Sequence, residues 1–294
     1  MTAATPDLNR LRRPSGAFAM LAVDQREALR NMLSDARQAP VDDEAMAEFK
    51  LDAARLLTPY ASAVLIDRQF ALERAVEAGV VDPSCALIAS ADHFIPAHGE
   101  IVGEVEIDRL IPPARAAELG AVAQKLLVIY RPDQPAAQRV EMVTEFVEGC
   151  RAAGLVSIIE PLSKKPLDPG AAWDWDAGVL AAAQELGSLG ADLYKAEVPL
   201  HGKGDEAELK ARCAELTAAI ASPWVILSSG VAEADFPRAI QVACSAGASG
   251  FLAGRAVWAS CLTADDVHTA LATDAVARLQ RFCEVADAAV GALR

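Results

Sequence analysis

Eight short apolar runs recur along the chain, and a longer stretch with helical periodicity follows most of them. Each run is nearly continuous in Val, Ile, Leu and Ala, as expected for parallel strands covered on both faces. The runs are Phe18–Val23, Ala61–Ile66, Cys85–Ala89, Lys125–Tyr130, Leu155–Ile159, Ala191–Val198, Trp224–Leu227 and Gly250–Leu252. We therefore expect eight parallel strands.

The segments between these runs read as helices, which Asp, Ser or Pro often opens and Gly often closes. The expected helices are Gln25–Ala36, Asp42–Leu57, Gln69–Ala78, Ala136–Ala153, Asp174–Leu189, Asp205–Ala221 and Asp235–Ala246. Alternating strands and helices with short links imply right-handed βαβ units. Eight such units predict an α/β fold, a single (β/α)8 TIM barrel over residues 1–294. The surplus length fits an N-terminal lead-in and a C-terminal helical tail, Ala264–Arg294.

The least regular part of the chain is Asp92–Ala121, which carries a strand-like piece of its own, Gly103–Ile107. We interpret it as a long connection with a small β excursion over the barrel. No change in composition marks a second domain there.

Composition narrows the possible partners. The net charge of −14 argues against binding to nucleic acid or to an anionic membrane. No apolar run reaches the roughly 18 residues of a membrane span, and the N-terminus lacks the apolar stretch of a secretory signal. A cytoplasmic location is expected. The six cysteines are scattered without a CxxC pair, which favours reduced core thiols.

Polar residues interrupt or follow the predicted strands at the end where a TIM barrel has its active site. Taken singly, such residues are often solvated caps. Taken together they must compensate one another, because an unpaired buried charge is very costly. They are Asp24, Gln25, Arg26, Asp67, Lys125, Arg131, Glu160, Lys195, Glu197, Ser228, Ser229, Gly230, Gly254 and Arg255.

Lys195 lies in the middle of the sixth run, and strand alternation puts Glu197 on the same face. One interpretation is a solvated ion pair on an edge strand. The other is an amine nucleophile that forms a Schiff base with a carbonyl substrate. In that case Glu160 on the neighbouring strand is the first choice as proton-transferring base, and Lys125 supplies a second cation that helps keep Lys195 unprotonated.

The seventh and eighth runs end in SSG and AGR, which have the character of a phosphate site. Glycines expose backbone N–H groups, Ser229 offers a hydroxyl, and Arg255 offers a fork for an oxyanion. TIM barrels often bind phosphate at this place. The alternative is a pair of tight turns that need the small residues Gly230 and Gly254.

No metal or cofactor is expected from the sequence. The four histidines form no HxH or HExxH pattern, whereas a zinc-dependent aldolase would show several His ligands. Lysine chemistry is favoured over metal chemistry.

The segments AMLAVDQREALRNML, ASAVLIDRQF, LVSIIEP, GADLYKAEVPL, PWVILSSGV and AGASGFLAGRAVWAS resemble class I aldolases of the tagatose-bisphosphate aldolase group. The likeness covers nearly the whole chain and looks closest to the sulfofructosephosphate aldolase branch. The resemblance implies reversible cleavage of 6-deoxy-6-sulfofructose 1-phosphate, a phosphorylated sulfosugar, in sulfoquinovose catabolism. The products would be dihydroxyacetone phosphate and 3-sulfolactaldehyde.

The resemblance also implies roles for particular residues. Lys195 matches the Schiff-base lysine, Glu160 the proton-transferring carboxylate, and Lys125 and Asp24 their partners. The phosphate cradle would be Ser229, Gly230, Gly254 and Arg255. Arg131 stands where tagatose-bisphosphate aldolases have an acidic residue, so Gln25, Arg26 and Arg131 are the candidates for reading the sulfonate.

Three alternatives stay open: an aldolase for tagatose or fructose 1,6-bisphosphate, a non-covalent phosphosugar isomerase or epimerase, and a non-catalytic phosphosugar-binding barrel. We also expect a homo-oligomer, because TIM barrels commonly associate. The apolar C-terminal segment Ala270–Leu293 is the candidate interface.

Overall fold

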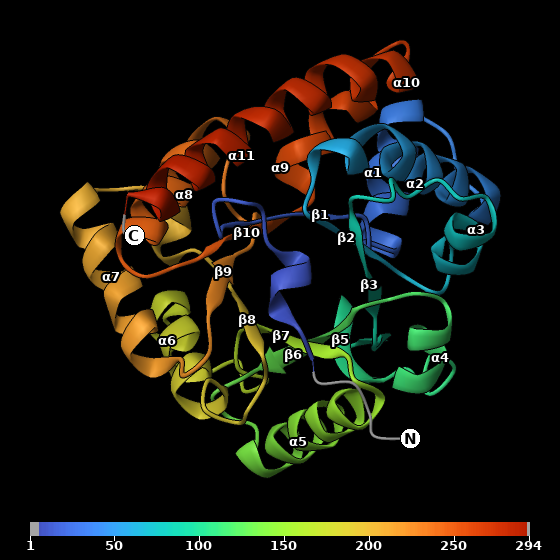
Figure 1. Ribbon diagram of the computed structural model, residues 1–294. Coiled ribbons are helices and arrows are strands. Elements are labelled where there is room, and N and C mark those ends of the chain that lie inside the picture. The colour runs from blue at the N-terminus through green and yellow to red at the C-terminus, as the bar shows by residue number, and fades with distance from the viewer. Residues whose placement is uncertain (1–5, 293–294) are drawn as a thin grey trace.

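The computed structural model describes residues 6–292, in which eight parallel strands close into a barrel ringed by helices (Figure 1). The strand order around the barrel is β1-β10-β9-β8-β7-β6-β3-β2. The strands are β1 (Phe18–Ala22), β2 (Ala63–Ile66), β3 (Ala86–Ser90), β6 (Ala123–Tyr130), β7 (Val156–Ser163), β8 (Leu193–Ala196), β9 (Trp224–Ile226) and β10 (Gly250–Ala253). Each coincides with a predicted run, so the predicted TIM barrel is confirmed.

The helices follow the strands as predicted. They are α1 (Glu27–Arg37), α2 (Asp43–Leu57), α3 (Leu72–Glu77), α4 (Pro113–Glu118), α5 (Ala136–Ala153), α6 (Trp175–Leu186), α7 (Glu206–Ala219), α8 (Phe236–Ser245), α9 (Arg255–Trp258), α10 (Val267–Ala270) and α11 (Val276–Gly291). The short helices α4 and α9 were not predicted, because their six and four residues contain too little periodicity to show in the sequence.

Local capping explains several helix boundaries. The side chains of Asp42, Asp174 and Asp205 each accept a hydrogen bond from a backbone N–H in the first turn of α2, α6 and α7. At the other end of α5, Gly154 adopts the left-handed conformation, with φ of 72°, that a helix C-terminus commonly needs.

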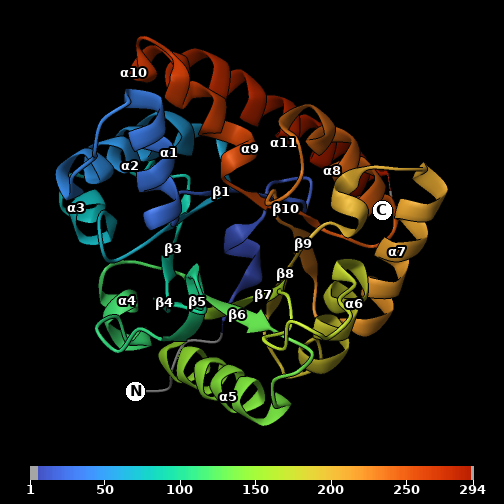
Figure 2. The same cartoon turned by 180° about the vertical axis from the view of Figure 1, so that it is seen from behind.

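The predicted β excursion is an antiparallel hairpin of β4 (Asp92–Ala97) and β5 (Glu100–Ile107), seen beside β6 in Figure 2. It follows β3 directly and precedes α4. The base of the hairpin is held by Asp108, whose backbone N–H donates to Ala91 O over 2.7 Å. Its position at the end of β3 brings it to the edge of the barrel where the polar residues gather.

The core has two layers. Inside the barrel, Phe18, Met20, Leu65, Ile158 and Leu252 belong to one buried cluster, which Leu11 joins from the 3₁₀ helix Leu8–Leu11. A larger cluster fills the space between the strands and the helices. The six cysteines are all buried and unpaired.

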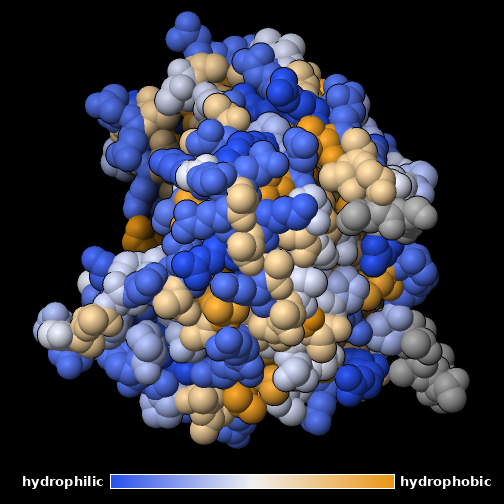
Figure 3. Space-filling view, turned by 90° about the vertical axis from the view of Figure 1, so that its left-hand side faces the viewer, coloured by the Kyte–Doolittle hydropathy of each residue, from blue (hydrophilic) through white to orange (hydrophobic). Residues whose placement is uncertain are grey.

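The C-terminal tail is helical as expected: α11 packs against α8 and approaches α2, with a π-helical turn, Leu271–Ala275, before it. Leu293 and Arg294, like residues 1–5, lie outside the described part. On the face shown in Figure 3, hydrophobic residues are scattered among hydrophilic ones. Within residues 6–292 no helix is long and apolar enough to cross a membrane. Oligomerisation stays a prediction.

Candidate active site

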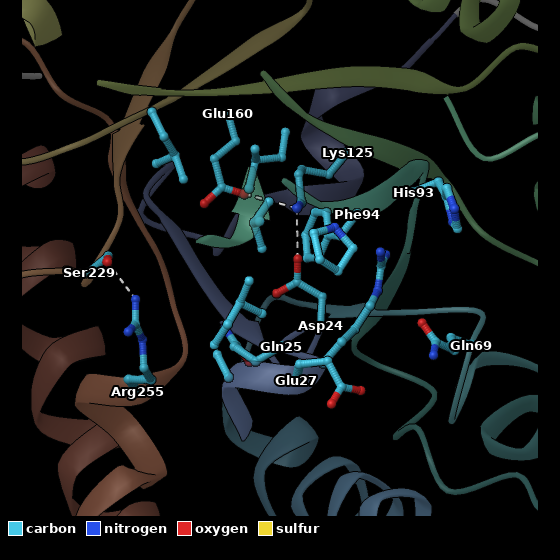
Figure 4. A pocket seen from close by; sticks show the side chains of 17 residues that line it. Asp24, Gln25, Glu27, Gln69, His93, Phe94, Lys125, Glu160, Ser229 and Arg255 are labelled. Carbon is cyan, nitrogen blue, oxygen red and sulfur yellow. Dashed lines mark hydrogen bonds and ion pairs between the residues drawn. The ribbon is translucent and has the colours of Figure 1, made fainter. Parts of the chain in front are cut away.

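A cavity of about 330 Å³ opens at the C-terminal ends of the barrel strands (Figure 4). Asp24, Lys125 and Glu160 contribute to its centre, while Ser229 and Arg255 lie on one side of it. Residues of the β4–β5 hairpin form another wall. The parallel barrel therefore brings together side chains that are far apart in the sequence, as TIM barrels do.

Lys125 is the centre of a buried charge network. Its Nζ lies 2.7 Å from Asp24 Oδ2, 2.8 Å from Asp92 Oδ2 and 2.9 Å from Glu160 Oε2. Burial alone would lower the pKa of Lys125, but the three carboxylates outweigh burial and raise the pKa well above its usual value. Lys125 is therefore a permanent cation in this site.

Lys195 reaches the same network through Glu160. The Nζ of Lys195, on β8, lies 2.7 Å from Glu160 Oε1, on β7. Glu160 thus bridges the two lysines with its two oxygens, and only 4% of the Lys195 side chain is exposed. An isolated edge-strand pair of Lys195 with Glu197 is excluded, because β8 lies between β7 and β9 in a closed barrel.

Asp24 and Asp92 balance this positive charge. Burial would raise the pKa of each carboxyl, but the attraction of Lys125 outweighs it, with help from Lys195 at Asp24 and Arg26 at Asp92, and both pKa values are lowered. Asp24 is held in place from behind by Lys50, a fully buried residue of α2. The Lys50 Nζ donates to Val23 O and Gln25 O over 2.7 and 2.6 Å and pairs with Asp67.

Asp92 is the main residue that sequence reasoning missed. Both of its oxygens are occupied: Oδ2 accepts from Lys125 Nζ and Leu127 N, and Oδ1 accepts from Arg26 Nη2 and Ser90 Oγ. Its position immediately after the third apolar run was the available signal. Lys50 gave no such signal, because a lysine within a helical pattern is ordinarily exposed.

The predicted phosphate residues lie close together. The Arg255 guanidinium donates to the Ser229 hydroxyl across the gap between the ends of β9 and β10 (Figure 4). A Cβ at Gly254 would lie 2.5 Å from Ala22 O and 2.9 Å from Gln25 Nε2, so glycine allows β10 to approach β1 at this point. Gly230 follows Ser229 in a left-handed turn, with φ of 79°.

The three candidates for the distal anion are placed differently. Gln25 and Arg26 line the cavity, and Arg26 stacks on Phe94 of the hairpin with 4.0 Å between its guanidinium carbon and the ring centroid. Arg26 Nε and Gln25 Oε1 are buried without a hydrogen-bond partner among the described residues.

Arg131 does not line this cavity. Its side chain is 1% exposed, and its guanidinium binds Glu100 of the hairpin over 2.8 Å and the carbonyl of Lys165. Arg131 comes directly after Tyr130, the last residue of β6. The geometry assigns Arg131 to the support of the hairpin and argues against direct contact with a ligand in the cavity.

Glu197 lies just beyond β8 and is 8% exposed. Its Oε2 accepts a hydrogen bond of 2.7 Å from Ser163 N. Burial, together with the nearby charge of Glu160, raises the pKa of Glu197 to about 8. The two glutamates therefore differ in environment: Glu160 touches two lysines, whereas Glu197 touches none.

Comparison with known families shows which family the chain belongs to. Residues 18–260 match the family model described as DeoC/LacD family aldolase. The chain belongs to the DeoC/LacD family of aldolases. It is therefore a lyase of carbohydrate metabolism.

Its relatives include tagatose 1,6-diphosphate aldolase of Listeria monocytogenes serotype 4a (strain HCC23), which is 31% identical over 282 residues, covering 86% of this chain and 80% of the relative. Tagatose 1,6-diphosphate aldolase 1 of Enterococcus faecalis (strain ATCC 700802 / V583) is 26% identical over 266 residues, covering 83% of this chain and 80% of the relative.

Solved structures of aldolases share the fold of this DeoC/LacD chain. A Schiff-base-forming fructose-1,6-bisphosphate aldolase superposes with a TM-score of 0.62 and 18% identity, covering 95% of this chain and 97% of that one. Fructose-bisphosphate aldolase from Plasmodium falciparum gives a TM-score of 0.67 at 15% identity, covering 96% of this chain and 92% of that one.

Proposed function

We propose that this aldolase cleaves 6-deoxy-6-sulfofructose 1-phosphate to dihydroxyacetone phosphate and 3-sulfolactaldehyde through a Schiff base on Lys195. The observation that carries the proposal is the position of Glu160, which is bonded to Lys195 at 2.7 Å and to Lys125 at 2.9 Å. A nucleophilic amine needs an adjacent base, and Glu160 is within hydrogen-bond reach of it.

The reaction then follows from the contacts. Lys195, as the free amine, attacks the C2 carbonyl of the ketose, and loss of water gives an iminium. Glu160 takes the proton from the C4 hydroxyl, the C3–C4 bond breaks, and its electron pair enters the iminium as an enamine. The aldehyde leaves first. Protonation at C3 and hydrolysis of the resulting imine release dihydroxyacetone phosphate and regenerate Lys195.

Lys125 and Asp24 support this chemistry. Lys125 remains a cation because three carboxylates surround it. Its ammonium contacts Glu160 Oε2, while the other oxygen of Glu160 contacts Lys195. Asp24 holds the Lys125 ammonium in place at 2.7 Å.

The two ends of the substrate would be bound by different groups. Ser229, Gly230, Gly254 and Arg255 hold the phosphate in this proposal, at the place where TIM barrels often bind one. Arg26 and Gln25 read the sulfonate. A sulfonate carries one negative charge, against about two for a phosphate. Arg26 already shares its charge with Asp92 at 2.7 Å, so it suits a monoanion better than a dianion.

The competing function is cleavage of tagatose or fructose 1,6-bisphosphate. It is favoured by the names of the relatives, which are tagatose 1,6-diphosphate aldolases. The ratio of kcat/KM for the sulfonated ketose phosphate to kcat/KM for each bisphosphate decides between the two. A ratio well above 1 supports the sulfosugar, and a ratio well below 1 overturns it in favour of a bisphosphate.

The covalent step has its own test. Reduction with borohydride in the presence of substrate should add the mass of the reduced triose phosphate at Lys195, and Lys195→Met should lose both the adduct and turnover. An unmodified Lys195 under conditions of active turnover would exclude the Schiff base. Activity in excess EDTA is the accompanying check for a metal.

A further inference from the structure

A second cavity, of about 450 Å³, lies beside the first and meets it at Ser229. It is bounded by the end of β7, the segment 164–175 and the 3₁₀ segment Pro199–Gly202. Glu197 and the Ser229–Gly230 turn complete its walls. Lys125 and Glu160 line the first cavity but not this one, and Lys195 lines neither. The proposed cleavage reaction assigns no role to the walls formed by Trp173, Trp175 and His201.

His201 is held in this cavity wall by a strained backbone. Leu200 and His201 are consecutive non-glycine residues in the left-handed region, with φ of 56° and 51°, which is an unfavourable conformation. Asp176 Oδ1 accepts from Leu200 N over 2.7 Å, and Arg238 Nη1 donates to Gly202 O over 2.9 Å. These contacts fix the strained segment and the position of the His201 ring.

The surroundings of the ring indicate which nitrogen carries the proton. The ring stacks on Trp175 with 3.8 Å between centroids, and Nδ1 is buried without a hydrogen-bond partner. A Cβ on Gly230 would lie 2.6 Å from Nδ1, so a Cα–H of Gly230 points toward this nitrogen. A lone pair tolerates that contact and an N–H does not. The proton of the neutral ring is therefore on Nε2, which is not enclosed and has no partner among residues 6–292.

Lys165 adds a positive charge to the cavity wall. Its side chain is exposed, and its ammonium lies 5.8 Å from the centroid of the Trp173 ring and has no ion-pair partner in the described part of the chain. Trp173 also lines the cavity, but its Nε1 is buried and closed to a ligand. In a chain with a net charge of −14, a cation without an ion-pair partner beside a histidine donor favours an anionic ligand.

The carboxylates in the wall do not oppose an anion. Glu100 is engaged by Arg131 and Lys164. Glu197 is mostly uncharged at neutral pH, because burial raises its pKa to about 8. The cavity therefore presents donors and a positive charge next to the loop assigned to the substrate phosphate.

We propose that this cavity is a second oxyanion site, which binds free phosphate or a phosphate ester through His201 Nε2–H and the Lys165 ammonium. Its ligand is additional to the substrate phosphate held by Arg255 and is bound without covalent chemistry. The site does not depend on the identity of the substrate or on a Schiff base at Lys195.

Tryptophan fluorescence of the intact protein can report binding, because two of the four tryptophans, Trp173 and Trp175, lie in this wall and the other two are buried in the core. Titration with inorganic phosphate, against potassium chloride at matched ionic strength, should give a saturable change. The change should persist in Arg255→Ala. Phosphate affinity should fall at least tenfold in Lys165→Met, and the exposed Lys210→Met serves as the matched control with wild-type affinity.

His201→Asn gives a second, independent variant, because asparagine tolerates the left-handed backbone but is too short to place a donor where Nε2 lies. It too should weaken phosphate binding at least tenfold. A signal that vanishes in Arg255→Ala and persists in Lys165→Met would show that phosphate occupies only the substrate cradle, which overturns the proposal, as does a change that never saturates. Tighter binding of glycerol 3-phosphate than of phosphate would identify an ester as the preferred ligand, and the reverse would identify free phosphate.

Discussion

Asp92 and Lys125 form an ion pair of 2.8 Å in which neither side chain is exposed, although Asp92 comes from the hairpin and Lys125 from a barrel strand. The hairpin is therefore part of the charge network beneath the cavity as well as a wall of it. Asp92 also holds Arg26, the proposed reader of the distal anion, at 2.7 Å. Asp92 thus orients both Lys125, which takes part in the proposed reaction, and Arg26, which is proposed to bind the distal anion.

Replacing Asp92 by Asn should impair both properties. The amide would place an NH₂ group toward Arg26 or Lys125, and Lys125 would lose one of its carboxylates. We expect kcat to fall on the order of 100-fold and the free energy of unfolding to fall by about 3 kcal/mol. Steady-state kinetics and urea unfolding measure the two effects. Glu106→Gln, a substitution of an exposed residue on the same hairpin, is the control. Wild-type kinetics in Asp92→Asn would show that Asp92 does not contribute to catalysis.

The lowered pKa values of Asp24 and Asp92 predict the response to acid. A carboxyl whose pKa is lower in the folded state adds stability above its unfolded value of about 3.9, and this contribution is lost as pH falls through the folded value. Urea unfolding between pH 7 and pH 3 should show stability declining below about pH 4. The decline should be shallower in Asp92→Asn, and an equally steep decline would contradict the pairing.

Glu197 predicts the opposite dependence. Its pKa rises from the ordinary 4.5 to about 8 on folding, so its contribution to stability is full below 4.5 and is lost as pH rises toward 8. Glu197→Gln removes this loss because glutamine does not ionise. The variant should be more stable than the wild type at pH 8 by more than it is at pH 5. Chemical unfolding at both pH values measures this, and an equal difference at the two would refute the raised pKa.

Arg26 and Arg131 provide a matched pair for the specificity proposal. Arg26 lines the cavity, whereas Arg131 is engaged with Glu100 and the Lys165 carbonyl outside it. Arg26→Met should lower kcat/KM for the sulfonated ketose phosphate on the order of 100-fold, because a buried charged hydrogen bond to the substrate is lost. Arg131→Met should leave the ratio of kcat/KM values for sulfonated and bisphosphorylated ketoses unchanged. If this ratio changed in Arg131→Met and not in Arg26→Met, Arg131 and not Arg26 would be the residue that binds the distal anion.

The barrel could be predicted because strand-length apolar runs and helical periodicity carry its whole pattern. Each of the eight strands has a sequence signal of its own, and their order follows from the handedness of βαβ connections. The positions of Lys125, Glu160 and Lys195 followed as well, since charged residues inside such runs are rare. The ion pairs of Glu160 with Lys125 and Lys195 then follow from the strand order, because β7 lies between β6 and β8.

The residues that the sequence did not reveal are those whose partners lie outside the repeating pattern. Asp92 belongs to the irregular segment after β3, where its place after the third apolar run was its one signal and did not reveal its partners. The pairing of Arg131 with Glu100 could not be predicted, because Glu100 lies on the hairpin, whose position over the barrel no periodicity encodes. Glu197 follows β8, but its contact is with Ser163 N on β7 and not with Lys195, and this contact required the register of β7 and β8.

The hairpin, tied at its base through Asp92 and further along through Glu100, also bears on loop engineering in this family. A grafted hairpin of different sequence would break the contacts of Glu100 with Arg131 and Lys164, and it would leave Lys125 and Arg26 without Asp92. Selectivity and rate would then change in one step. A library of variants should therefore change the solvent-facing positions of β5 and keep Asp92 and Glu100. The substrate range can then be varied while the contacts of Lys125 and Arg26 are preserved.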